Sequence, residues 1–527
     1  MKNYEEKSNL YAILHQKETW LNRRTIHIKK LDAITQLGVI GDSRDILVLV
    51  KFLNHDSREI RRSTINSIEI LFEKLDSKST YETILRHCTI HKNDIRKYIK
   101  NYSGKQLQYP LAIASINSNG YIREDALNHI LENDLSESLI QFIIYRLGDW
   151  VPEVRIAAER NFNHVLTTGK WESILNHLDL IFWLKKVQRV DLSIIYNKTI
   201  EYLLIDNSNE TYSKFRELSE SIRFNLCKEI LKLDTVSEIS QNTFINDKSY
   251  LVRSKIAENL RKTKNPSQLI PILQNDKSAL VRQKCLLSRS KISSESGKIN
   301  FKEFLFDKSA TIRNIARFHL KDSNVNFLEI YKKGLEDNSL LVSSIYSIGE
   351  FGSEEEVDLI LPYYNSQNGN IKKAAIRTIL KLDATRIQSQ LLDELNSKLK
   401  SVRKLAIENL SISPNDTVVN RCREIYSSGD VELKLSMLTF FGRVCSYKTL
   451  PDLINALDDS NENVVNSAWL HLTNWRKNSI SNYTIQDEKD KIRAQEIYGQ
   501  IKFRAELSFA NKKLWNEIPY FGRFNKE

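Results

Sequence analysis

Apolar residues recur along this chain at the spacing of amphipathic helices. The clearest stripe lies in the segment 250–262, where Leu251, Val252, Ile256, Ala257 and Leu260 recur at the helical spacing of three to five residues, partly as adjacent pairs. Shorter helical patterns precede such stripes, most clearly at 41–56, 352–365 and 449–460. The alternation of the two patterns predicts helical hairpins, each made of a first and a second helix.

A repeated motif lies at the turn inside these hairpins. Asp-Lys-Ser occurs at 247–249, 276–278 and 307–309, and an Arg follows six residues after each Asp. The aligned position of this Arg, which we call the Arg column, recurs every 29 to 31 residues as far as Val465, although Ser343, Lys372, Lys434 and Val465 replace the Arg at four of the steps. The column continues upstream to Arg61 with less regular steps. A period near 30 predicts a stacked array, because one hairpin cannot bury its apolar face alone.

The motif predicts a structural ladder. Asp and Ser are expected to cap the second helix, and each Arg emerges one turn later, where it can reach the equivalent Asp of a neighbouring hairpin through charge-assisted hydrogen bonds. The predicted ladder consists of Asp247, Arg253, Asp276, Arg282, Asp307 and Arg313.

Helix ends are marked by paired glycines in 37–43 and 348–354. We expect each pair to close a second helix in the left-handed conformation and to open the next first helix. Cys445 stands where the second glycine of a third pair would be. Ser353 with Glu356, and Thr449 with Asp452, have capping-box spacing.

The segments 37–71, 347–382 and 447–472 resemble HEAT repeats of the short bacterial kind also found in phycobilisome-lyase-type proteins. The resemblance covers roughly residues 37–475. It implies an all-α, right-handed αα-superhelix of about 12–14 hairpins, with second helices lining a concave face. We expect capping helices at 1–36, the HEAT-like solenoid at 37–475, and further helices with a tail at 476–527. In that tail, Tyr520, Phe521 and Phe524 are expected to pack back on the last repeat, and the alternative is that they dock on a partner.

Charge is concentrated in one part of the chain. The net charge of the whole is +12, yet residues 241–321 alone hold 17 basic and 6 acidic residues. A basic strip focuses potential on an anionic partner. The proposed partner-binding positions are Lys255, Arg261, Lys262, Lys264, Lys284, Arg289 and Arg317, whereas Phe318 is expected in the core.

Candidate chemistry is sparse. His87 and His91 share one helical face if that segment is a helix, but no third metal ligand is identifiable. Trp150 beside Asp149 is the nearest approach to the Trp/Tyr/Asp cluster of HEAT-like DNA glycosylases, although Asp149 occupies the ordinary turn position. Bilin lyases are a second enzyme class with such repeats. We expect no catalytic residue, metal or cofactor.

These observations favour a non-enzymatic scaffold, adaptor or regulator that binds a protein along its concave face. The alternative is a nucleic-acid-binding protein, including a glycosylase-like one, that uses the strip at 241–321. Scattered cysteines without C-x-x-C, and a start without a signal-peptide pattern, favour a cytoplasmic protein. No apolar run approaches the roughly 20 residues of a membrane span, so we expect no membrane partner, and the resemblance implies a bacterial protein. The sequence leaves the oligomeric state open.

Overall fold

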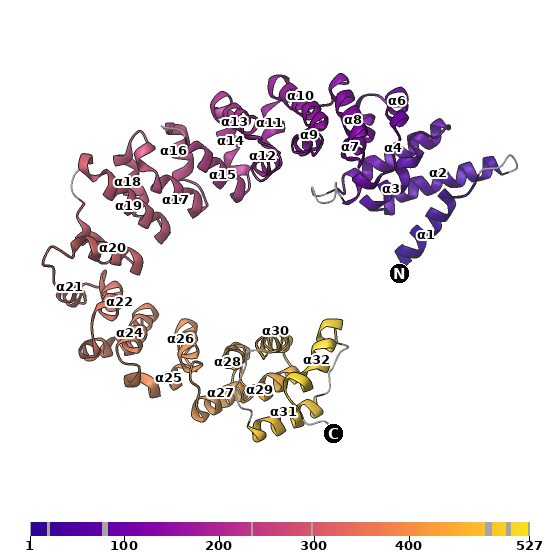
Figure 1. Ribbon diagram of the computed structural model, residues 1–527. Coiled ribbons are helices and arrows are strands. Elements are labelled where there is room, and N and C mark those ends of the chain that lie inside the picture. Colours follow the sequence, from indigo (N-terminus) through magenta and orange to yellow (C-terminus); the bar gives the residue numbers. More distant parts are fainter. Residues whose placement is uncertain are drawn as a thin grey trace. The chain divides into compact units, whose positions relative to one another are not determined.

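The computed structural model describes residues 2–17, 22–75, 83–232, 236–296, 299–479, 487–501 and 507–524. The chain divides into two compact units, residues 1–298 and 299–527. β-Structure among the described residues is limited to an isolated bridge between Val236 and Thr263. The all-α array of helical hairpins predicted from the sequence is confirmed within each unit (Figure 1). None of the described helices is long and apolar enough to span a membrane.

The helices of the first unit are α1 (Lys2–Leu14), α2 (Arg23–Ile40), η1 (Ser43–Asp45), α3 (Ile46–Leu49), η2 (Val50–Phe52), α4 (Arg58–Phe72), η3 (Leu85–His87), α6 (Lys92–Asn101), η4 (Gly104–Gln106), α7 (Gln108–Ile116), α8 (Gly120–Glu132), α9 (Ile140–Leu147), α10 (Pro152–Thr168), α11 (Trp171–Leu175), α12 (Leu178–Leu184), α13 (Ser193–Glu201), the π-helix η5 (Tyr202–Asp206), α14 (Ser208–Lys214), η6 (Phe215–Glu217), α15 (Glu220–Ile230), α16 (Glu238–Ile245), α17 (Tyr250–Glu258), η7 (Leu260–Lys262), α18 (Pro266–Gln274) and α19 (Ala279–Ser296).

The helices of the second unit are η8 (Phe301–Phe304), α20 (Ala310–Leu320), α21 (Phe327–Gly334), α22 (Leu341–Phe351), η9 (Glu354–Glu356), α23 (Val357–Ile360), η10 (Leu361–Asn365), α24 (Gly369–Leu382), η11 (Ala384–Ile387), α25 (Gln388–Glu394), α26 (Lys400–Leu410), α27 (Asp416–Ser428), α28 (Val431–Val444), α29 (Leu450–Asn455), η12 (Ala456–Asp458), α30 (Glu462–Ser479), α31 (Glu488–Gln500) and α32 (Phe509–Phe521).

Each unit is held together by contacts between neighbouring hairpins. Second helices pack against the next second helix along the chain, as α17 does against α19 and α22 against α24. In α17 the predicted stripe is buried at Val252, Ile256 and Ala257. One hydrophobic core therefore runs through the stack of the first unit, and another runs through the second.

The turn motif forms the predicted cap in α17. The Oδ1 atom of Asp247 accepts a hydrogen bond from the backbone N–H of Ser249 at 2.7 Å, and the Ser249 hydroxyl oxygen accepts one from the N–H of Leu251 at 3.2 Å. These contacts satisfy N–H groups that lack partners inside the helix. Glu356 likewise accepts from the N–H of Ser353 at 2.8 Å, as its spacing predicted.

The expectation of left-handed glycine caps is wrong. Gly41 (φ −74°, ψ 170°) and Gly352 (φ −83°, ψ −176°) are extended, whereas Cys445 (φ 47°, ψ 39°) is left-handed. Glycine is needed at 352 for space, because a Cβ there would lie 2.9 Å from the carbonyl oxygen of Ile348. The Thr449–Asp452 cap is also absent: the Thr449 hydroxyl donates to the carbonyl of Phe441 at 3.1 Å.

The first glycine of each pair permits close helix packing. A Cβ on Gly38 would lie 2.7 Å from the Ser67 hydroxyl oxygen, and one on Gly349 would lie 2.9 Å from Oγ1 of Thr378. Each of these hydroxyls donates a 2.9 Å hydrogen bond to a backbone carbonyl of the facing helix. The same glycine–hydroxyl contact thus recurs at α2–α4 and α22–α24.

Further helices cover both ends of the chain. At the start, the apolar side chains Leu10 and Leu14 of α1 are buried, and α1 packs on α2. At the other end, Phe521 lies 5.3 Å from Trp475, measured between ring centroids, and Phe524 packs beside Tyr498 at 5.6 Å. Tyr520, which we expected to pack with them, is 78% exposed.

Candidate binding surface

The aligned arginines bind within and between hairpins. Arg253 uses Nη1 to donate to the carbonyl of Asp247, in its own turn, at 2.7 Å. Its Nε and Nη2 donate to the carboxylate of Asp276 in the following turn, at 2.6 and 3.0 Å. This arrangement is a bidentate, charge-assisted lock from one hairpin to the next.

The same lock occurs elsewhere in the first unit. Arg223 donates to Asp247 at 2.8 and 3.2 Å, and Arg123 donates to Asp149 at 3.0 and 2.7 Å. Arg282 bonds the carbonyl of Asp276 in its own turn at 2.8 Å. Burial alone would raise the pKa of Asp276, but the hydrogen bonds from Arg253 and from the N–H of Ser278 hold this pKa below its ordinary value.

Two arginines of the second unit use different acids for the lock. Arg313 bonds the Asp307 carbonyl at 2.7 Å, as the ladder requires, yet its carboxylate partner is Glu350 on α22. Arg403 similarly pairs with Glu432 on α28. At these two arginines the carboxylate lies on the second helix and not in the turn, whereas Lys434 of the same column pairs with Asp459 of the following turn at 2.7 Å.

Lys255 and Lys284 of the predicted basic strip converge on one carboxylate. Their Nζ atoms lie 2.8 and 2.6 Å from Glu258, on successive second helices. The side chains of both lysines are about one-third exposed, at 33% and 32%. Glu258 thus offsets one of the two charges that the column places together.

Other members of the strip bond groups within the chain. Arg261 donates to the carbonyl of Lys291, Lys262 donates to the carbonyl of Leu231 at 2.7 Å, and Arg289 donates to the side chain of Gln274 at 3.3 Å. The first two contacts join neighbouring hairpins, and the Lys262 contact lies at the C-terminal end of α15, where a cation is favourable. Lys264 is exposed.

Arg317 does not belong to an accessible strip. It is only 8% exposed, and its guanidinium donates to Glu350 at 2.8 Å and to the Tyr331 hydroxyl at 3.0 Å. The adjacent residue, Phe318, is 64% exposed, so its predicted core position is also wrong. Both differences concern which face of α20 is buried: Arg317 faces its neighbours and Phe318 faces solvent.

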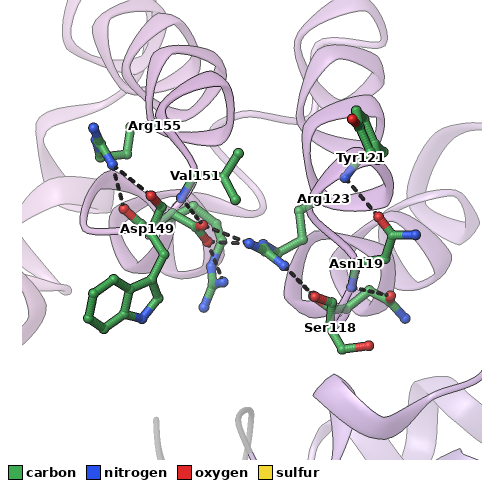
Figure 2. Close-up of polar contacts among 10 residues, drawn as sticks. Ser118, Asn119, Tyr121, Arg123, Asp149, Val151 and Arg155 are labelled. Carbon is green, nitrogen blue, oxygen red and sulfur yellow. Dashed lines mark hydrogen bonds and ion pairs between the residues drawn. The ribbon is translucent and has the colours of Figure 1, made fainter.

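A second basic site, which we did not predict, lies in the first unit. A cavity of about 230 Å³ opens between consecutive hairpins, and the charged and aromatic residues that line it are Arg86, Arg123, Tyr145, Arg146, Asp149, Trp150 and Arg189. Figure 2 shows Arg123 reaching from α8 toward Asp149 at the turn before α10. We call this site the arginine pocket.

Asp149 is fully engaged at the floor of the arginine pocket. Its carboxylate accepts hydrogen bonds from Arg123 at 3.0 and 2.7 Å, from Arg146 at 2.7 Å and from the N–H of Val151 at 3.0 Å. Burial would raise its pKa, but these donors hold the pKa of Asp149 below its ordinary value. A carboxylate bonded in this way is a poor general base, which weighs against the glycosylase hypothesis.

The rim of the arginine pocket is exposed. Trp150 is 77% exposed, and the Arg189 guanidinium stacks over its ring, 4.6 Å from the centroid. Arg86, in the middle of η3, is exposed as well. The pocket therefore combines buried arginines at its floor with exposed arginines and an aromatic at its mouth.

The other candidate metal-binding residues do not come together in the structure. His87 ends η3, whereas His91 precedes α6, so the two do not share a helix face. No group of three or more potential metal ligands gathers among the residues that the structure describes. Burial raises the pKa values of the Cys88, Cys227 and Cys285 thiols, each to about 12.

Comparison with known proteins gives only distant similarities. No family model matches the chain, and no curated protein matches it. Among solved structures, a crystal structure of importin beta is 12% identical, with 94% of this chain and 74% of that chain covered and a TM-score of 0.28. Kap95p, in a structure concerned with its binding to RanGDP, is 13% identical over 99% of this chain and 66% of that one, with a TM-score of 0.29. A homology model of the AP-3 complex is 12% identical over 99% and 90%, with a TM-score of 0.26.

Proposed function

We propose that this chain is a non-enzymatic, HEAT-like scaffold or adaptor that binds a protein partner through exposed side chains at its inter-helical turns. The observation that carries the proposal is Trp150, whose large apolar ring is 77% exposed next to a cluster of arginines. Trp and Arg are the residues most enriched among those that dominate protein–protein binding energy.

Tyr121 extends this surface. It is 75% exposed at the start of α8, and the neighbouring Gly120 lies against Val151 of the next turn, where an added Cβ would be 3.0 Å from Cγ2. Consecutive turns thus present Tyr121 and Trp150 from adjoining hairpins. A row of turns with aromatic side chains supplies the apolar anchors of an interface without any movement of the helices.

The internal bonding of the basic strip favours protein over nucleic acid. Arg261 and Lys262 are engaged with backbone carbonyls, and Lys255 and Lys284 share Glu258. A phosphate backbone requires many cations that are free to neutralise it.

On the sequence grounds given above, we place the protein in the cytoplasm of a bacterium.

Affinity capture with and without nuclease tests the proposal. Wild-type protein should retain a defined protein partner after nuclease treatment, and Trp150→Ala should lose most of it. Phe509→Ala is a matched control, because Phe509 is 88% exposed in the second unit. If nuclease abolishes capture, or if Trp150→Ala and Phe509→Ala behave alike, this protein-binding surface is wrong.

A nucleic-acid partner has a different signature. Binding to an oligonucleotide would fall steeply with salt, and charge reversal at Lys255 and Lys284 would weaken it. Such a result would support the alternative function at residues 241–321.

A further inference from the structure

The arginine pocket carries more positive charge than its structural role requires. Four arginines line it and one carboxylate, Asp149, offsets them, which leaves a local net charge of +3 from 4 − 1. A structural lock of this type needs only one arginine per carboxylate, as Arg253 and Asp276 show.

Arg146 is the most unusual member of the pocket. It is only 9% exposed, it lines the cavity, and its Nε is buried without a hydrogen-bond partner among the residues that the structure describes. Arg146 and Arg123 share the single charge of Asp149, so one buried positive charge is not neutralised. A buried charge without a counter-charge is strongly unfavourable.

Arg317 shows how the chain satisfies a second arginine where no ligand is needed. Arg313 and Arg317 also share one carboxylate, Glu350, but Arg317 has additional neutral acceptors in Asn314 and Tyr331. In the arginine pocket the Tyr145 ring covers one side of the Arg146 guanidinium, 4.2 Å from its carbon, but Nε of Arg146 has no acceptor among the described residues, and Arg146 lines the cavity. An anion in that cavity would supply the missing charge.

From these observations we infer that the arginine pocket binds the phosphate group of a phosphorylated serine or threonine side chain on the protein partner. The inference rests on the proposed function, since the partner supplies the phosphate. A phosphomonoester carries a charge of about −1.5 to −2 at pH 7, which suits the surplus of the pocket. Guanidinium groups bind its oxygens in bidentate fashion.

The dimensions and the rim select this ligand. A cavity of about 230 Å³ is smaller than the roughly 300–1,000 Å³ of sites that enclose a whole small molecule, so it fits one end of a larger group. A phosphomonoester projects its terminal oxygens from a single attachment, whereas a phosphodiester continues as chain on both sides and cannot enter end-on. Trp150 at the mouth is placed to contact the residues next to the phosphorylated one.

Isothermal titration calorimetry on the full chain tests the inference with four probes: N-acetyl-O-phosphoserine methylamide, its unphosphorylated counterpart, inorganic phosphate and the oligonucleotide dT12. The phosphorylated probe should bind at least about 10-fold more tightly than the unphosphorylated one, because charge-assisted hydrogen bonds are at stake. It should also bind more tightly than inorganic phosphate, since it adds contacts at the mouth.

Variants at the exposed rim connect the binding to the pocket without disturbing the core. Arg86→Gln and Arg189→Gln should each weaken the phosphorylated probe by about 10-fold, which is the loss expected for one hydrogen bond to a charged group. Arg160→Gln is the matched control, because Arg160 is exposed on α10 of the same unit and does not line the cavity, and it should leave affinity unchanged.

Three results would overturn the inference: equal affinity for the phosphorylated and unphosphorylated probes, equal or tighter binding of inorganic phosphate or dT12, or an unchanged affinity in both rim variants. Nuclease-resistant capture of a protein by wild type, measured separately, would then leave the scaffold function standing. Conversely, probe binding that passes every test while capture depends on nuclease would overturn the scaffold function.

Discussion

Removal of the Asp149 carboxylate tests whether the inter-hairpin lock stabilises the array. Asp149 is 4% exposed, and the two arginines that it binds, Arg123 and Arg146, are 7% and 9% exposed. Asp149→Ala deletes the acceptor of four hydrogen bonds and leaves both guanidinium groups in a low-dielectric site without a counter-charge. Asp149→Asn keeps the shape and one oxygen for the N–H of Val151, but it loses the charge.

The magnitude follows from these contacts. Breaking a buried ion pair from one side costs about 3–5 kcal/mol, and loss of the capping contact to Val151 adds about 1 kcal/mol. We therefore expect Asp149→Ala to lower the free energy of unfolding of the first unit by about 4–6 kcal/mol. For Asp149→Asn we expect a loss of about 3–5 kcal/mol, because the counter-charge is lost while the contact to Val151 is kept.

Urea unfolding followed by far-UV circular dichroism measures the loss. Hydrogen exchange of peptides from α9 and α10 localises it, because a repeat array need not unfold as one cooperative unit. Asp206→Ala is the control, since Asp206 is exposed in the same unit. If Asp149→Ala lies within about 0.5 kcal/mol of this control, the lock contributes nothing measurable and the reasoning is refuted.

Three further predictions follow from the packing and the pKa values. Gly38→Ala should destabilise the first unit by about 1–3 kcal/mol, because the new Cβ clashes with Ser67. Gly499→Ala has nothing within 4 Å of the new Cβ, so it should be neutral or stabilise its helix by up to about 1 kcal/mol. Thermal unfolding of both variants tests this difference. Cys445→Gly should raise stability by about 1–2 kcal/mol in the same assay, because a side chain at φ 47° is strained, and an unchanged midpoint would contradict the assignment of strain. Because the folded pKa of Asp276 lies below its unfolded value, its contribution is fully present above about pH 4 and is lost as the pH falls through the folded pKa. The thermal midpoint of wild type should therefore fall more steeply below pH 4 than that of Asp276→Asn, and parallel pH profiles would show that the pair contributes nothing.

The hairpin array was predictable because its signals are local and repeated. The apolar stripe of residues 250–262 depends only on helical periodicity, and the Ser249 cap depends on contacts two residues apart. The conformation of the glycines was not predictable in the same way. Gly41 and Gly352 mark helix ends, as expected, but steric crowding and not left-handed backbone requires them, and crowding depends on atoms that the pattern does not contain.

The candidate site shows the same limit at longer range. The column of arginines predicts which residues can form locks, but it does not predict which carboxylate pairs with each arginine. Glu350 and Glu432, which pair with Arg313 and Arg403, lie outside the turn motif. Charge counting along the sequence pointed to 241–321, where much of the surplus is engaged with carbonyls, and not to the pocket of four arginines.

Arg146, three residues before Asp149, is the one local signal of the arginine pocket, since it places a second arginine beside a carboxylate that the repeat already assigns to Arg123. Arg86 and Arg189 join it only because consecutive hairpins of the first unit are stacked, which brings side chains from positions 86 to 189 to one cavity. In a repeat array, the period fixes the position of each arginine–carboxylate lock. A functional site therefore arises where one hairpin carries an additional charged side chain that no lock uses. A search for such surplus charges, aligned to the repeat and not summed along the chain, would have found this pocket from the sequence.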